Sequence, residues 1–111
     1  GFSQGGALAL TAGLRSSRKL AGIIGLSAWL PLGKSYPEKL GQKVKEVPAL
    51  MCSGDADNVV NPLFSSHSSK AMSDLGIPVE FKSYAGLAHS ANPEELRDVR
   101  DFLQSALPVL R

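Results

Sequence analysis

The stretch Val47-Pro48-Ala49-Leu50-Met51-Cys52-Ser53 is an apolar run that stops abruptly at Gly54-Asp55-Ala56-Asp57-Asn58. A second apolar run covers residues 20–30, Leu-Ala-Gly-Ile-Ile-Gly-Leu-Ser-Ala-Trp-Leu. An apolar run without alternation of polar residues is typical of a parallel strand that is buried on both faces. We therefore expect buried strands at 20–30 and 47–53, the second of them ending in an acidic loop.

The segments around these two runs predict helices and one further strand. Helices are expected over residues 3–16, 62–75 and from about Asn92 onward. The second has a proline in its first turn and a glycine just past its end, and the third has an asparagine cap followed by proline. Residues 78–84 alternate in polarity, which favours a strand at a sheet edge. Residues 31–46 predict a surface connection with at most one short helix.

The last helix carries an apolar stripe at helical spacing, which predicts that it faces the core. The residues of this stripe are Leu96, Val99, Leu103, Ala106 and Leu107. Strands that alternate with helices indicate an α/β fold with a parallel sheet and right-handed crossovers. We expect residues 1–111 to form one α/β unit, with helices on both faces of the sheet.

The composition excludes several classes of function. The chain has 111 residues, 43% of them hydrophobic, and 12 basic against 10 acidic residues give a net charge of +2. This balance is not that of a nucleic-acid-binding protein. No apolar stretch approaches the roughly 18 residues of a membrane span. The single cysteine, Cys52, cannot form an internal disulfide, so we expect a cytoplasmic protein and a buried, unreactive thiol.

The first residues, Gly1-Phe2-Ser3-Gln4-Gly5-Gly6, match the G-x-S-x-G pattern at the start of a helix. In this pattern a serine stands on a strained turn, and the glycines two residues to either side let the backbone segments pass closely. The N–H of Gln4 would lie at a helix N-terminus, where it can bind an oxyanion. The alternative is an ordinary serine cap in a tightly packed helix start.

The order of the remaining residues favours a catalytic Ser-Asp-His set. After Ser3, the acids Asp55 and Asp57 follow one strand and His89 follows the next, at the strand ends where open α/β sheets place their chemistry. His89 would be the general base, and a carboxylate would orient it. Position alone favours Asp57 and leaves Asp55 as the alternative. His67 falls mid-helix among serines and is expected to be exposed and incidental.

Taken together, these residues closely resemble the acyl-protein thioesterase and lysophospholipase family of the α/β-hydrolase superfamily. The resemblance spans nearly the whole chain and matches the C-terminal half of the family. Its segments are 1–8, 20–22, 26–32, 54–57, 81–90 and the closing helix to Leu107-Pro108. The chain departs from the family pattern in Ser53-Gly54, where His-Gly is usual, and in 58–62, where the family is richer in proline.

The resemblance implies an activity and assigns further residues. It implies hydrolysis of long-chain acyl thioesters and esters on acylated proteins and lysophospholipids, without a cofactor or metal. It makes Asp57 the third triad residue and Asp55 a loop-ordering residue. It places Trp29, Val59 and Phe64 along an acyl channel, with ordinary core packing as the alternative. It also allows a homodimer and, at most, transient contact with a membrane surface.

Residues 1–111 are expected to be a partial domain, because the N-terminal strands of the family's sheet and its oxyanion loop are not found in this sequence. The family takes a second oxyanion N–H from an H-G-x-G-like loop, and no such segment occurs. Loss of one oxyanion donor typically costs about 10²- to 10³-fold in rate. We therefore expect the isolated 111-residue chain to be inactive or nearly so. The alternative function is a truncated acyl- or protein-binding module, which would not react covalently with a fluorophosphonate at Ser3.

Overall fold

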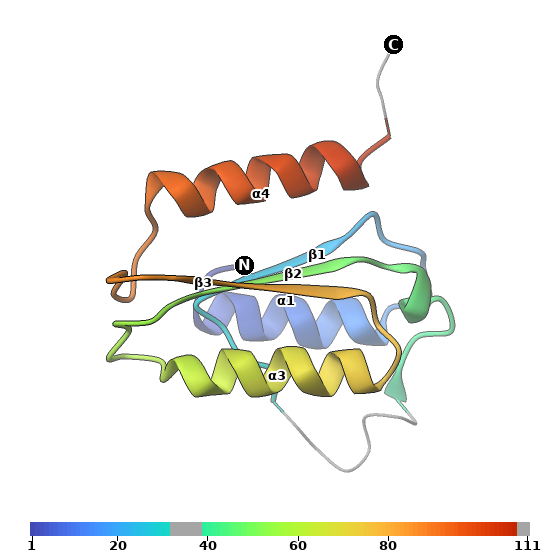
Figure 1. Ribbon diagram of the computed structural model, residues 1–111. Helices are drawn as coiled ribbons and strands as arrows, with labels where there is room; N and C mark the ends of the chain where they lie inside the picture. Colours follow the sequence, from blue (N-terminus) through green and yellow to red (C-terminus); the bar gives the residue numbers. More distant parts are fainter. Residues whose placement is uncertain (32–38, 109–111) are drawn as a thin grey trace.

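A computed structural model describes residues 1–31 and 39–108, which form a parallel sheet with helices on both faces (Figure 1). Helices α1 and α3 cover one face of the sheet, and α4 lies across the other. The predicted α/β class is thereby confirmed. The elements are α1 (Gln4–Arg15), β1 (Ile23–Leu26), the 3-10 helix η1 (Val44–Glu46), β2 (Ala49–Gly54), α3 (Pro62–Asp74), β3 (Val79–Tyr84) and α4 (Pro93–Ala106).

The three strands stand in the order β1-β2-β3 and pair in parallel. Ala49 of β2 aligns with Ile23 on one side and with Val79 on the other. Within the described residues β3 is an edge strand, as its alternating sequence predicts. The burial of β3 does not follow the alternation of apolar and polar residues, because Phe81 is exposed whereas Tyr84 is buried.

Strand β2 is buried along its whole length, which confirms the prediction for this segment. Ala49 and Met51 belong to the core cluster on the side of α1 and α3. Leu50 and Cys52 belong to the smaller cluster on the side of α4. Burial raises the pKa of the Cys52 thiol to about 11, so this cysteine stays protonated and unreactive at neutral pH.

The prediction of a strand over residues 20–30 is wrong in extent, because β1 covers only Ile23–Leu26. Ser27 has a positive φ of 51°, which turns the chain out of the strand. Its N–H still donates to the carbonyl oxygen of Cys52 at 2.8 Å. The following residues Ala28 and Leu30 are buried, so the apolar run continues as a buried loop rather than as a strand.

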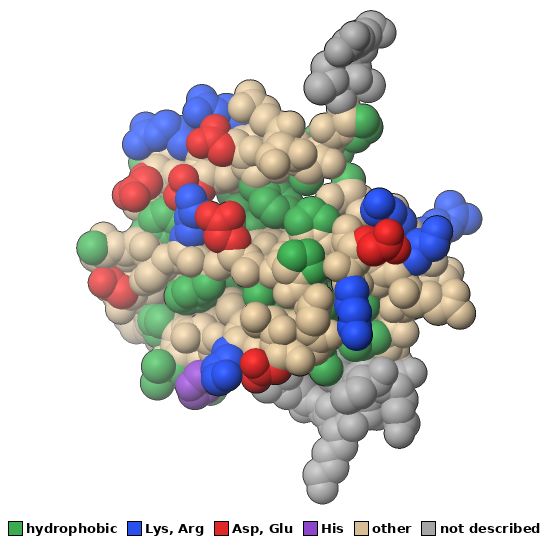
Figure 2. Space-filling view, turned by 45° about the vertical axis from the view of Figure 1, so that its right-hand side comes forward, with side chains coloured by type: hydrophobic (Ala, Val, Ile, Leu, Met, Phe, Trp, Pro, Cys, Tyr) green, Lys and Arg blue, Asp and Glu red, His purple; other side chains and the backbone are tan. Residues whose placement is uncertain are grey.

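The prediction that the apolar stripe of α4 faces the core is confirmed for Val99 and wrong for its leucines. Leu96, Leu103 and Leu107 are 55%, 40% and 50% exposed. The residues of α4 that pack toward the sheet are Val99 and Phe102. Figure 2 shows hydrophobic side chains gathered in a band below α4, among charged side chains of both signs. The helical period predicts an apolar stripe, but it does not say which elements cover it.

The connection from residue 31 to residue 46 is only partly described. Among the described residues of this connection, Val44–Glu46 form η1, whose residue Val44 is buried against the core. Residues 32–38 lie outside the described part of the chain, so the rest of this prediction stays open.

The close packing around Gly54, at the end of β2, can be tested by substitution. A Cβ atom at this position would stand 2.1 Å from the carbonyl oxygen of Leu87, in the loop that leads to His89. We expect Gly54→Ala to destabilise the full-length protein by about 1–3 kcal/mol, because the backbone must move to admit the methyl group. Thermal unfolding measures the loss. Gly5→Ala is the control, since a Cβ there meets no atom of residues 1–31 or 39–108 within 4 Å. Equal melting temperatures for the two variants would contradict the crowding at Gly54.

Candidate active site

Ser3 stands on a strained turn between the sheet and α1. Its φ is 55° and its ψ is −126°, a conformation that costs a non-glycine residue about 1–3 kcal/mol. Its N–H donates to the carbonyl oxygen of Leu26 at 2.8 Å, which ties the turn to the end of β1. The Ser3 side chain makes no capping hydrogen bond to the helix. The serine is therefore not a simple N-cap, and its hydroxyl is available for other contacts.

The glycines around Ser3 are used differently from the prediction. A Cβ on Gly1 would stand 2.4 Å from the carbonyl oxygen of Gly5, so Gly1 is required where the pattern places it. A Cβ on Gly5 would meet no atom within 4 Å of the described structure, and the expectation of crowding at Gly5 is wrong. Crowding occurs instead one residue later, where a Cβ on Gly6 would stand 2.4 Å from the Cβ of Ala28.

The side chains of Ser3, His89 and Asp57 form one chain of hydrogen bonds. The Ser3 Oγ lies 3.0 Å from Nε2 of His89, and Nδ1 of His89 lies 2.8 Å from Oδ2 of Asp57. Ser3 and His89 are 86 positions apart in sequence, so the contact depends entirely on the fold. His89 follows β3 and Asp57 follows β2, at the same edge of the sheet.

The environment of Asp57 fixes the proton positions in this chain. Burial by itself would raise the pKa of the Asp57 carboxyl, but hydrogen bonds from His89 and from two backbone N–H groups outweigh it and lower the pKa below its usual range. The two backbone groups are those of Val59 and Val60, each 2.9 Å from Oδ1. An ionised carboxylate only accepts hydrogen bonds. His89 therefore donates from Nδ1, which leaves Nε2 free to accept the Ser3 hydroxyl proton.

The other acid and the other histidine lie elsewhere. Asp55 accepts a hydrogen bond from the N–H of Gly86 at 2.7 Å, which joins the loop after β2 to the loop after β3. It makes no contact with the imidazole among the described interactions. His67 is exposed on α3, as predicted from its surroundings in the sequence.

The aromatic ring of Phe2 packs against the imidazole of His89, a contact that the sequence analysis missed. The ring centroids lie 4.8 Å apart with the planes tilted by 41°. Phe2 is 43% exposed, so the pair sits at the surface of the site. The only signal in the sequence is an aromatic residue next to the serine, which says nothing of a contact with residue 89.

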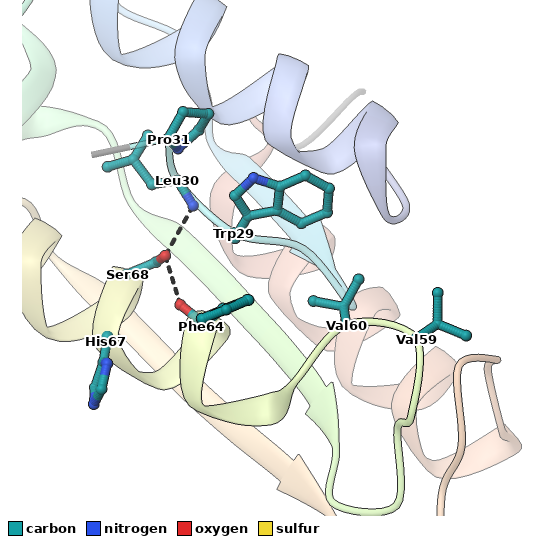
Figure 3. Close-up of a pocket in the computed structure, with 8 residues that line it drawn as sticks. All are labelled: Trp29, Leu30, Pro31, Val59, Val60, Phe64, His67 and Ser68. Atoms are coloured by element: carbon teal, nitrogen blue, oxygen red, sulfur yellow. Dashed lines mark hydrogen bonds between the residues drawn. The ribbon is translucent and has the colours of Figure 1, made fainter. Parts of the chain in front are cut away.

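An apolar cavity of about 410 Å³ adjoins the hydrogen-bonded chain (Figure 3). The predicted channel residues Trp29, Val59 and Phe64 all line it. Val59 is 68% exposed and Phe64 is 58% exposed, so these two side chains are not part of the core. The remaining lining residues are Leu30, Pro31, Val60, His67 and Ser68. In Figure 3 the His67 side chain points away from the cavity.

The cavity and the hydrogen-bonded chain share a piece of backbone. Val59 and Val60 line the cavity and donate their N–H groups to Asp57.

Gln4 is the first residue of α1, and the N–H groups of the first turn of a helix have no partner within the helix. An anion beside Ser3 would thus meet the N-terminus of α1, where the helix dipole also favours negative charge.

The described part of the chain shows neither a cluster of three or more metal-ligating side chains nor a helix long and apolar enough to cross a membrane.

Comparison with known proteins assigns the family. The sequence profile of the phospholipase/carboxylesterase family matches residues 1–107. This chain belongs to that family. It is 43% identical to acyl-protein thioesterase 1 of Gibberella zeae and 44% identical to that of Neurospora crassa, each over 110 residues and 97% of this chain. It covers 47% and 45% of those proteins, so it spans about half the length of the curated relatives it matches.

The structural comparison agrees with the family assignment. The crystal structure of SOBER1 from Arabidopsis thaliana superposes with a TM-score of 0.91 at 31% identity, over 97% of this chain and 51% of SOBER1. The described residues thus have the fold of part of an α/β-hydrolase.

The lowered pKa of Asp57 predicts how stability depends on pH. A carboxyl whose pKa is lower in the folded state stabilises the fold above its unfolded pKa, and this stabilisation is lost as the pH falls through the folded pKa. We expect wild-type protein to exceed Asp57→Asn in unfolding free energy at pH 6. The difference should begin to shrink below about pH 4 and continue to shrink as Asp57 takes up a proton. Chemical denaturation at a series of pH values measures it; a difference that is constant between pH 6 and pH 3 would contradict the assignment.

Proposed function

We propose that this chain carries the nucleophile, base and acid of a serine hydrolase that cleaves long-chain acyl thioesters and esters. The observation that carries the proposal is the unbroken chain of hydrogen bonds from Ser3 through His89 to Asp57. A serine hydroxyl is a weak nucleophile until a neighbouring imidazole accepts its proton. The family assignment and the thioesterase relatives support the same reaction class.

The first half of the reaction follows from the proton positions. Ser3 Oγ attacks the acyl carbonyl carbon while its proton passes to Nε2 of His89, and Asp57 stabilises the resulting imidazolium. The carbonyl oxygen becomes an oxyanion, to which the N–H of Gln4 donates at the N-terminus of α1. When the intermediate collapses, the bond to the thiolate or alkoxide breaks, and the leaving group takes the proton from Nε2. The acyl group is then an ester of Ser3.

The second half uses the same residues with water as the nucleophile. His89 accepts a proton from water, the hydroxide attacks the acyl carbon, and the bond to Ser3 Oγ breaks. Ser3 recovers its proton from His89, and the fatty acid leaves. No group beyond the chain's own side chains and water enters the balance of either half.

The cavity beside the hydrogen-bonded chain supports an apolar acyl group as the part of the substrate that is bound. Trp29, Val59 and Phe64 present apolar surface to it, and each methylene removed from water contributes about 0.8 kcal/mol. The curated relatives are named acyl-protein thioesterases, which supports acylated proteins as substrates, and we include lysophospholipids in the proposal.

A cytoplasmic location fits the single buried cysteine, Cys52. The homodimer stays a prediction from resemblance.

Covalent labelling tests the nucleophile directly. In the full-length protein, a fluorophosphonate probe should attach to the peptide that contains Ser3, and Ser3→Ala should abolish both labelling and ester turnover. Ser17→Ala changes an exposed serine and should leave both unchanged. Attachment at another residue, or turnover that survives Ser3→Ala, would overturn the proposal, and absence of labelling would favour a binding module.

The two acids of the loop after β2 provide a matched pair. Asp57→Asn should lower kcat by about 10⁴-fold, because the amide no longer holds His89 in the tautomer that accepts the Ser3 proton. Asp55→Asn should cost much less, since an amide oxygen can still accept the N–H of Gly86. Steady-state kinetics on a chromogenic ester distinguish the two variants; similar losses would exclude Asp57 as the specific partner of His89.

A further inference from the structure

One wall of the apolar cavity is a loop without strand pairing. The segment from Ala28 to Pro31 follows the positive-φ residue Ser27 and lies beyond the end of β1. Trp29, Leu30 and Pro31 of this segment line the cavity. Its position must therefore be held by contacts other than the hydrogen bonds of the sheet.

Two serines of α3 hold this wall. The Oγ of Ser65 donates a hydrogen bond to the carbonyl oxygen of Ala28. The Oγ of Ser68 accepts a hydrogen bond from the N–H of Leu30 at 2.8 Å. Both serines are buried, with 0% and 2% of their surface exposed, and Leu30 is 3% exposed. Water cannot readily replace such bonds, because the backbone groups that they satisfy lie away from solvent.

The hydroxyl of Ser68 joins the loop to the helix that lines the other side of the cavity. It accepts from the N–H of Leu30 in the loop and donates to the carbonyl oxygen of Phe64, one turn earlier in α3, at 2.6 Å (Figure 3). Phe64 and Leu30 both line the cavity, one from α3 and the other from the loop. The bond within α3 orients the hydroxyl, and the bond to Leu30 fixes the loop against the helix.

We propose that Ser68, assisted by Ser65, is a positioning residue that sets the width of the cavity and thereby the acyl-chain preference of the enzyme. The proposal rests on the function proposed above, since it assigns the cavity to the acyl chain. Ser68 touches no reacting atom, and it acts through the backbone of Leu30 and Phe64. Its removal should leave the Ser3–His89–Asp57 chain in place and change only the fit of the acyl group.

Ser69 is the matched control. It stands next to Ser68 on the same helix and is also buried, with 5% of its surface exposed. Its Oγ donates to the carbonyl oxygen of Ser65, within α3 itself. Loss of the Ser69 hydroxyl removes a buried hydrogen bond of the helix without touching the loop, so it reports the general cost of such a change.

The test compares kcat/KM for the p-nitrophenyl esters of butyrate and decanoate in the full-length protein. Burial of a methylene is worth about fourfold in kcat/KM, so wild type should favour decanoate. We expect Ser68→Ala to reduce the decanoate-to-butyrate ratio by about sixteenfold, the equivalent of two methylenes. Ser69→Ala should leave the ratio within about twofold and keep the wild-type rate of fluorophosphonate labelling at Ser3. Ser68→Ala should still be labelled at Ser3, since it leaves the serine and its hydrogen-bond partners in place.

Two further measurements keep the test decisive. The first is a second variant for the case that Ser68→Ala does not fold, and the second is a fluorescence signal that reports the cavity wall directly. Ser68→Cys keeps the shape of the side chain with a slightly larger atom that is only a weak donor and acceptor, so it should lower the ratio even if Ser68→Ala does not fold. Trp29 is the only tryptophan of these 111 residues. Its emission, isolated by subtraction of the matching Trp29→Phe protein, should shift to longer wavelength in Ser68→Ala and not in Ser69→Ala, because the loosened wall admits water.

Two results would overturn the proposal, and they are distinguishable. If Ser3 is labelled and wild type favours decanoate, but Ser68→Ala and Ser68→Cys match Ser69→Ala in the ratio, the positioning role is excluded and the proposed hydrolase stands. If wild type is neither labelled at Ser3 nor active on either ester, the proposed function fails and the positioning role fails with it.

Discussion

The parallel register of β2 between its two neighbours is the constraint on which the site depends. Pairing continues past the ends of the strands: Ser27 donates to the carbonyl of Cys52, and Asp55 donates to that of Tyr84. The loops after all three strands therefore leave from the same edge. Ser3 joins this edge through its own hydrogen bond to Leu26. A slip in register would move the loop carrying His89 away from Ser3, whatever the local sequence of that loop.

The parts of the fold that follow from local pattern were predictable. An apolar run predicts a buried strand when it is paired on both sides, as β2 is, and proline and asparagine mark the starts of α3 and α4. The run over 20–30 misled because a buried loop needs the same apolar residues as a buried strand. The turn at Ser27 results from its positive φ, which the serine side chain does not predict. The stripe on α4 misled because helical period says which residues share a face, but not what covers them.

The residues of the site divide in the same way. The order of Ser3, Asp57 and His89 could be recognised because strand ends in a parallel sheet converge. Trp29, Val59 and Phe64 could be placed at the cavity from the resemblance, but the serines that hold its wall could not be predicted, since the buried face of α3 is mostly serine. Ser65, Ser68, Ser69 and Met72 repeat at the spacing of a helix that faces the core, yet only the last is apolar. Hydrophobic periodicity does not detect a buried helix face made of serines. The role of a buried serine can be inferred only when its hydrogen-bond partner in another element is known.

The two parts of the site are held by different kinds of contact. Ser3, the proposed nucleophile, is positioned by main chain against main chain, because the carbonyl of Gly5 leaves no room for a side chain on Gly1. The cavity is held by side-chain hydroxyls on a helix. Substitutions on α3 can therefore reshape the cavity over many generations while the turn that carries Ser3 keeps its geometry. A scaffold built in this way allows substrate preference to diverge among descendants without each step passing through a loss of catalysis.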